Sequence, residues 1–186
     1  MRRFEFVSLQ SINIPESVTE IGEYAFGDCI DLKKIHIPSS IKKIGIGAFS
    51  GCGLEQITVD NNNPLFDSRD DCNAIISKDD NRLIIGCKNT IIPLTVTIIG
   101  SFAFESCEIE EITIPNNIIK IEDYAFSNCS KLEIIYIPKG ERSKFEKLLP
   151  EYKEKLEEIY QDEKDYLTDF VLPDGSIYNG ESLLSR

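Results

Sequence analysis

Apolar positions recur along this chain with a step of 23 residues between Pro15 and Pro38 and of 22 between Pro93 and Pro115. Each copy opens with the pattern Leu-x-x-Ile-x-Ile-Pro, in which apolar and polar residues alternate. This alternation predicts a short strand with one buried face. The proline is expected to end the strand because it has no N–H to donate to a neighbour.

A second extended piece and a turn complete each copy. The stretches "SVTEI", "SIKKI" and "TVTII" predict another short strand. Gly22, Gly45 and Gly100 follow it, and Glu122 takes this position in a fourth copy. Glycine tolerates backbone angles that are closed to other residues, so we expect a bend there. The next stretch, "YAFGDC" and its equivalents, is predicted to be a helical turn that packs alanine and phenylalanine inward.

Repeats of this length are typical of solenoids, whereas a propeller blade needs a longer unit with four strands. We therefore predict a solenoid over residues 1–138, with one parallel strand per repeat spaced by roughly 4.8 Å. The fold class is α/β, leaning to mostly β. The repeats start near residues 9, 32, 54, 87, 109 and 132.

Residues 60–89 interrupt the period. The apolar runs "CNAII" and "RLIIGC" flank the polar stretch "SKDDN", which predicts a β-hairpin. We expect this hairpin to stay stacked in the solenoid, with Phe66 packed under the loop.

The last segment, 139–186, is predicted to be a C-terminal helical cap and tail that covers the apolar end of the solenoid. Pro150 is expected to divide the cap into two helical pieces. The part after residue 160 has no assigned role. At the other end, "MRRFEFV" either supplies an edge strand or follows upstream repeats that were removed. The cap's apolar residues recur at helical spacing: Phe145, Leu148, Leu149, Tyr152, Leu156 and Ile159.

The repeated phrase "LxxIxIPxSVTxIGxxAFxxCxx" resembles the BspA-like (Treponema-pallidum-type) leucine-rich repeat family of bacterial surface proteins. The matching copies cover residues 9–138, and the insertion is similar to those within BspA-like domains. The resemblance implies a curved, right-handed leucine-rich-repeat solenoid whose concave face is lined by strands. It also implies a role in adhesion, or in recognition of protein or glycan partners outside the cell.

The chain's charge narrows the classes of partner. A formal net charge of −12 argues against sequence-independent binding to nucleic acid or to anionic lipid. No apolar run is long enough for a membrane helix, and no apolar segment of a secretory signal follows the first two arginines. The residues alone therefore do not indicate a localisation, while the resemblance implies the cell surface or the exterior of the cell. An intracellular protein-protein interaction scaffold is the alternative function.

The residues offer little support for catalysis, so we predict no enzyme, cofactor or metal site. His36 is the one histidine, and it lies on the solvent side of its strand. The stretch "DNNNP…DSRDD" gathers calcium-type ligands, but its spacing fits a solvated loop of turn-forming residues better.

The cysteines are predicted to be structural. Cys29, Cys52, Cys107 and Cys129 take equivalent places in their repeats, where we expect buried free thiols. Cys72 and Cys87 could form a cross-strand disulfide, although two buried thiols are the favoured alternative.

The outward strand positions form the candidate recognition surface, and a monomer is expected to present it. The candidate partner-binding concave face comprises Lys34, His36, Gln56, Thr58, Glu111, Thr113 and Tyr136. Further outward positions are Ser11, Asn13, Ile91 and Ile134. Ile134 and Tyr136 either contact a partner or are covered by the cap, and we favour the cap.

Overall fold

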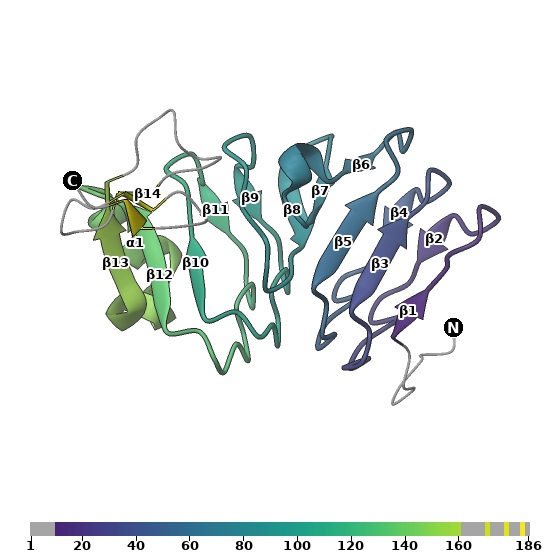
Figure 1. Ribbon diagram of the computed structural model, residues 1–186, viewed down its shortest axis with the longest axis horizontal. Helices are drawn as coiled ribbons and strands as arrows, with labels where there is room; N and C mark the ends of the chain where they lie inside the picture. The colour runs from purple at the N-terminus through teal and green to yellow at the C-terminus, as the bar shows by residue number, and fades with distance from the viewer. Residues whose placement is uncertain (1–9, 161–169, 172–176, 179–182, 185–186) are drawn as a thin grey trace.

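The computed structural model describes residues 10–160 and the backbone of three short strands beyond them, at 170–171, 177–178 and 183–184. The expected edge strand in residues 1–7 lies outside the described residues, as does most of the tail. Figure 1 shows the repeats side by side along the long axis of the molecule, from the N-terminal repeat at one end to the cap at the other.

The first strand of each repeat joins a parallel sheet. The strands β1 (Ser11–Ile12), β3 (Lys34–Ile37) and β5 (Gln56–Val59) pair in that order. A second parallel sheet contains β10 (Glu111–Thr113), β12 (Ile134–Pro138) and β13 (Leu156–Ile159). The strands β3 and β5 alternate exposed and buried residues, as their sequences predict. Isoleucines stack across these sheets, because Ile35 is paired with Ile57 and Ile112 with Ile135.

The second extended piece of each repeat is also a strand. β2 (Glu20–Ile21) pairs in parallel with β4 (Lys43–Ile44). β9 (Ile98–Ile99) pairs in the same way with β11 (Lys120–Ile121). Polar side chains join neighbouring repeats beside these strands: Ser40, before β4, donates to the Val18 carbonyl (2.7 Å), and Asn63, in the insertion, donates to the Ile41 carbonyl (3.0 Å).

The stretch "YAFGDC" forms consecutive tight turns, and the prediction of a helical turn is wrong. The Gly27 and Cys29 N–H groups bond three residues back, to Tyr24 (3.0 Å) and Phe26 (3.2 Å). The alternate N–H groups donate to the next repeat: that of Phe26 to the Ala48 carbonyl and that of Asp28 to the Ser50 carbonyl, both at 2.8 Å. A helix keeps its hydrogen bonds within one segment, whereas stacked repeats satisfy half of these N–H groups laterally.

Each turn holds two residues in the left-handed region of backbone space. The first takes φ values between 49° and 63° and the second between 55° and 72°. The first position is filled by Tyr24, Gly47, Phe102 and Tyr124, and the second by Asp28, Gly51, Ser106 and Asn128.

The glycines before these turns are required by close packing, which corrects the expectation that their backbone angles explain them. A Cβ atom on Gly45 would lie 2.3 Å from the Glu23 nitrogen, and one on Gly100 would lie 2.9 Å from the Leu83 carbonyl oxygen. The backbones of adjacent repeats therefore approach too closely at these points for a side chain.

The insertion adds strands to the sheet that contains β9 and β11. It contains β6 (Phe66–Asp67), the 3-10 turn η1 (Arg69–Asp71), β7 (Ile75–Ser77) and β8 (Arg82–Ile85), and the sheet order is β11-β9-β8-β7-β6. β7 and β8 pair antiparallel, and Phe66 is buried.

The β7–β8 pair separates two clusters of buried apolar side chains within residues 10–160. Ile75 and Ile85, which are cross-strand partners, belong to the N-terminal cluster. Ile76 and Leu83, also partners, belong to the C-terminal cluster. Both faces of the pair are therefore buried, which accounts for the continuous apolar runs in its sequence.

The cap consists of α1 (Arg142–Leu148), the 3-10 segment η2 (Pro150–Lys155) and then β13. Pro150 begins the second piece, as its sequence indicates. Leu156 and Ile159, predicted to be helical, instead lie in β13, which runs parallel to β12. The physical reason is that β12 would otherwise leave an unpaired sheet edge next to the buried end of the solenoid.

The three tail strands form a separate antiparallel sheet. They are β14 (Phe170–Val171), β15 (Ile177–Tyr178) and β16 (Leu183–Leu184), in that order.

Candidate functional site

The N-terminal part of the candidate face is a polar patch on β3 and β5. Lys34 is paired in register with Gln56, and His36 with Thr58, and all four side chains are exposed. The Nδ1 atom of His36 lies 2.9 Å from the Thr58 hydroxyl, within hydrogen-bonding distance. Two neighbouring repeats thus present their outward side chains side by side.

The C-terminal part of the candidate face lies on β10 and β12. Glu111 is exposed, while its neighbours Thr113 and Tyr136 are half-buried and paired in register. The Tyr136 hydroxyl donates to the Glu111 carboxylate over 3.4 Å. Burial raises the pKa of Tyr136, and the nearby carboxylates of Glu111 and Glu157 raise it further. Ile134 is half-buried as well.

The insertion separates these two parts, and one side chain completes the sheet edge between them. The amide of Asn73 donates to the Glu55 carbonyl (2.8 Å) and accepts from the Ile57 N–H (2.6 Å). A neighbouring parallel strand would make the same two types of bond with β5. The Asn73 carbonyl in turn accepts from the Thr90 hydroxyl (2.8 Å), which connects β5 to the next repeat.

A polar hollow of about 500 Å³ lies beside this bridge, between β5 and the insertion. Its walls carry amide, hydroxyl and carboxylate groups, which can donate and accept hydrogen bonds. The polar residues that line it with Asn73 are Gln56, Thr58, Asn61, Ser68, Asp71 and Asn89.

Two of the predicted face residues, Gln56 and Thr58, line the hollow, and the other lining residues are absent from the predicted set. Asn61, Ser68 and Asp71 come from the insertion, whose path could not be derived from a repeat pattern that it interrupts. The available signal was the run of asparagine and aspartate, residues that favour turns and left-handed backbone. Asp71 and Asn73 indeed have φ values of 50° and 57°.

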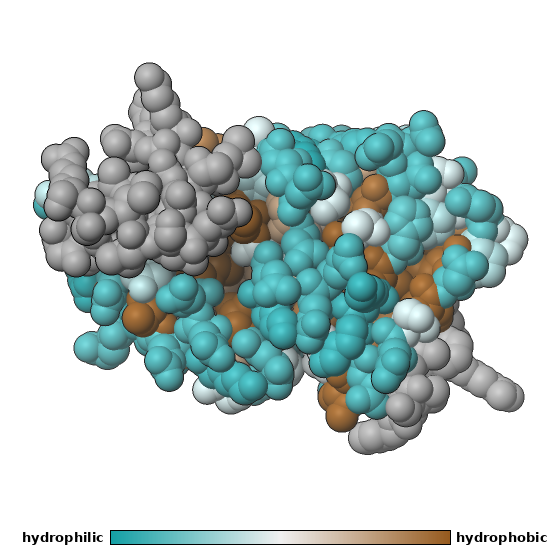
Figure 2. All heavy atoms as spheres, in the orientation of Figure 1, coloured by the Kyte–Doolittle hydropathy of each residue, from teal (hydrophilic) through white to brown (hydrophobic). Residues whose placement is uncertain are grey.

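Around β3 and β5, the surface in the view of Figure 2 is largely hydrophilic, with hydrophobic patches between the polar residues. Ile91, an outward position in the repeat that follows the insertion, is 56% exposed.

All six cysteines are free thiols, and five of them are buried; Cys52, predicted to be buried, is half-buried. Burial raises the pKa of Cys52 and of Cys107 to about 12, and the neighbouring cysteine of the adjacent repeat adds to the effect. Burial also raises the pKa of Cys129, to about 11. Cys52 and Cys129 each donate to a phenylalanine carbonyl of the preceding repeat, at 2.9 Å. Thiols held in the neutral form are poor nucleophiles, so these groups act as packing residues.

Cys72 and Cys87 belong to different apolar clusters, on opposite sides of the insertion. The Cys72 thiol lies 3.8 Å from the Ser68 hydroxyl, and the Cys87 thiol donates to the Asn73 carbonyl (3.4 Å). The cross-strand disulfide is therefore not formed in this structure.

Within the part of the chain that the structure describes, no three histidine, cysteine or acidic side chains lie close enough to hold a metal ion. None of the helices in that part has both the length and the apolar character needed to cross a lipid bilayer.

Comparison with known proteins finds a matching family model and several solved structures with a similar repeat. A family model described as BspA type leucine rich repeat region matches in six copies, over residues 1–69 and 83–172. A search of curated proteins returns no significant match.

Solved structures with a similar fold include the pneumococcal vaccine antigen PcpA. It is 24% identical, with a TM-score of 0.56 over 71% of this chain and 40% of that one. A leucine-rich repeat protein from Eubacterium ventriosum is 23% identical, with a TM-score of 0.52 over 69% and 42% of the two chains. A leucine rich cell surface protein from Faecalibacterium prausnitzii is 30% identical over 77% and 36%, with a TM-score of 0.45. The chain spans less than half the length of each of these proteins.

Proposed function

Because the chain belongs to the BspA-type leucine-rich-repeat family, we propose that it is a non-catalytic recognition module. Its ligand is a protein or a glycan, bound on the candidate face. Membership of a repeat family supports recognition over catalysis, because such folds offer an extended surface rather than an enclosed site.

The observation that carries this proposal is the register of outward polar side chains on adjacent parallel strands. Lys34 lies beside Gln56 and His36 beside Thr58, so the spacing between neighbouring groups is set by the backbone ladder. Such a surface is held in place before a ligand arrives, which reduces the entropy lost on binding.

The ligand contacts are proposed to include the polar hollow next to β5. Its amide and hydroxyl groups suit hydroxyl-rich or peptide ligands, which offer both donors and acceptors. We propose no nucleic-acid ligand and no membrane insertion, since the net charge of −12 opposes a polyanionic partner.

From the family resemblance, we propose a right-handed solenoid that works at the bacterial cell surface or outside the cell. We also propose that the module is a monomer. The strand-lined face is its concave side.

A binding screen with paired variants tests the proposal. The purified chain is applied to arrays of extracellular matrix proteins and glycans, and any hit is titrated. The variant K34A/Q56A removes two side chains that are in register on β3 and β5. We expect it to weaken binding by about tenfold or more, equivalent to at least ~1.4 kcal/mol.

The matched control is E20A/K43A, which removes a pair in register on β2 and β4, away from the candidate face. It is expected to bind like the unchanged chain. A screen without hits, or equal losses in the two variants, would refute recognition through this face.

A further inference from the structure

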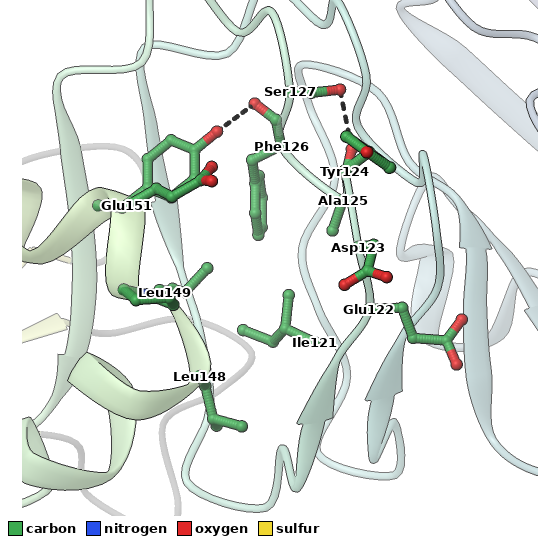
Figure 3. Close-up of a pocket in the computed structure, with 12 residues that line it drawn as sticks. Ile121, Glu122, Asp123, Tyr124, Ala125, Phe126, Ser127, Leu148, Leu149 and Glu151 are labelled. Atoms are coloured by element: carbon green, nitrogen blue, oxygen red, sulfur yellow. Dashed lines mark hydrogen bonds between the residues drawn. The ribbon is translucent and has the colours of Figure 1, made fainter.

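A second groove lies outside the candidate face, between the last complete turn of the solenoid and the cap (Figure 3). Its volume is about 410 Å³. Ile121 and Phe126 contribute apolar surface from the solenoid, and Leu148 and Leu149 do so from the cap. The groove exists because the cap replaces the turn that a further repeat would stack on Phe126.

Tyr152 holds the cap against the solenoid at the apolar end of the groove. Its hydroxyl donates to the Phe126 carbonyl (2.7 Å), and its ring meets the Phe126 ring edge to face, with centroids 6.1 Å apart. Phe126 itself stacks on Phe104 at 5.1 Å. The groove is therefore formed by packed residues of the solenoid and the cap.

An aromatic column leads to the groove along the turns. Tyr24 meets Phe102 edge to face (6.1 Å), and Phe102 stacks on Tyr124 (5.2 Å). Tyr124 lines the groove and is 64% exposed, so the ring face opposite Phe102 is accessible.

The backbone of Tyr124 has a φ of 63°, a region that disfavours residues with a side chain. Gly47 occupies the equivalent position of another turn with a φ of 62°. Tyr24 and Phe102 also take this left-handed position, so the aromatic column is built from equivalent positions of the turns.

Carboxylate side chains line the groove on both sides. Asp123 comes from the solenoid side and Glu151 from the cap side, and both are exposed (Figure 3). No ion pair joins either of them to a lysine or arginine within the described residues. Glu122 differs, because Arg82 (2.5 Å) and Lys120 (2.8 Å) already neutralise it.

We propose that this groove binds an arginine side chain of a basic segment in a partner protein. The planar guanidinium would stack on Tyr124 and donate to Asp123 and Glu151, while its methylene stem would lie on the apolar floor. Charge complementarity favours this occupant, since two carboxylates that have no ion pair among residues 10–160 flank an aromatic face on a chain of net charge −12. A neutral apolar segment would leave both carboxylates without a partner.

Nuclear magnetic resonance titration of the full chain tests the proposal. The probe is N-acetyl-arginine N-methylamide, and the neutral isostere N-acetyl-citrulline N-methylamide is the comparison. We expect saturable shifts of the amide signals of residues 121–127 and 148–152 with the arginine probe. The citrulline probe should bind at least about fivefold more weakly, because it lacks the charge that both the ring and the carboxylates attract.

Three variants separate the contributions. Replacing Tyr124 by glycine removes the ring without left-handed strain and should weaken arginine binding about two- to fivefold. D123N/E151Q should weaken it about fivefold or more. The control E20Q/D70N removes two other exposed carboxylates and should change the affinity less than twofold.

Equal binding of both probes, or an equal loss in the E20Q/D70N control, would overturn the proposal. So would shifts confined to other residues. Concentration-dependent self-association that Y124G abolishes would identify a second copy of the chain as the occupant and would also overturn it. The K34A/Q56A variant should keep its arginine affinity, so failure of this proposal is distinguishable from failure of the candidate face.

Discussion

At the scale of single residues, polar side chains that satisfy a neighbouring repeat hold the solenoid in register. Asn63 is the strongest case, because its side chain is buried and makes four hydrogen bonds. It donates to the carbonyls of Pro38 and Ile41 and accepts from the N–H groups of Leu65 and Phe66. The sequence "DNNNP" alone does not reveal which asparagine has this role, since it depends on the preceding repeat.

Replacing Asn63 by alanine should therefore lower the free energy of unfolding by about 3 kcal/mol, because several buried polar groups lose their partner. Urea denaturation followed by circular dichroism measures the change. N62A is the control, since Asn62 is exposed, and it should change the value by less than about 0.5 kcal/mol. A similar loss in both variants would contradict the assigned role of Asn63.

The raised pKa values of two thiols predict a loss of stability at alkaline pH. In the unfolded chain they ionise near pH 9, whereas the folded-state pKa of Cys52 and Cys107 is about 12. As the pH rises, these thiols therefore ionise in the unfolded chain before they ionise in the folded one, which stabilises the unfolded chain. Their contribution to the free energy of unfolding is complete below pH 9 and is lost as the pH rises from 9 to 12.

The slope of unfolding free energy against pH between 9 and 11 measures this effect. The variant C52A/C107A should show a shallower decline than the unchanged chain, whatever its stability at pH 7. Identical slopes would show that these thiols are not held neutral by the fold.

At the scale of elements, close contact between backbones limits which residues the repeats accept. Gly86, which follows β8, is buried, and a Cβ atom there would lie 2.1 Å from the Phe104 ring. Phe104 is itself fully packed against Phe126. The contact joins the end of the insertion to the next repeat, so it controls how the two apolar clusters meet.

The variant G86A should lose about 2 kcal/mol of stability, because the ring must move within a packed core. Thermal or urea unfolding measures the loss. Gly140 provides the control: a Cβ atom there meets no atom within 4 Å, and its φ of 87° is tolerated best by asparagine after glycine. A neutral G86A, or a G140N that is equally damaging, would be inconsistent with this packing.

At the scale of the whole molecule, the sequence predicts the repeated elements well because each depends on its own residues. The alternation in "KKIHIP" is enough to define β3, its buried face and its outward side chains. The family resemblance is likewise confirmed by the repeat model. Features that depend on contacts between repeats were missed or wrong, such as the strand at Leu156 and the Asn73 bridge.

In the candidate site too, the features set by a repeat's own residues are predicted and those set by contacts between segments are not. Lys34, His36, Gln56 and Thr58 are exposed on adjacent strands, where the alternation predicts them. The hollow beside them is formed by the insertion, whose residues break the period and whose fold depends on packing against β5. Their roles in ligand binding remain predictions.

Covalent labelling of exposed side chains in the presence of a ligand from the binding screen tests the central claim most directly. Acetylation of lysines and carbethoxylation of histidine are quantified by mass spectrometry, with and without ligand. We predict that ligand protects Lys34 and His36. Lys42 and Lys43, which are exposed at the start of β4 and outside the candidate face, should keep their reactivity. Unchanged labelling of Lys34 and His36, with protection of Lys42 and Lys43, would contradict recognition through the strand face.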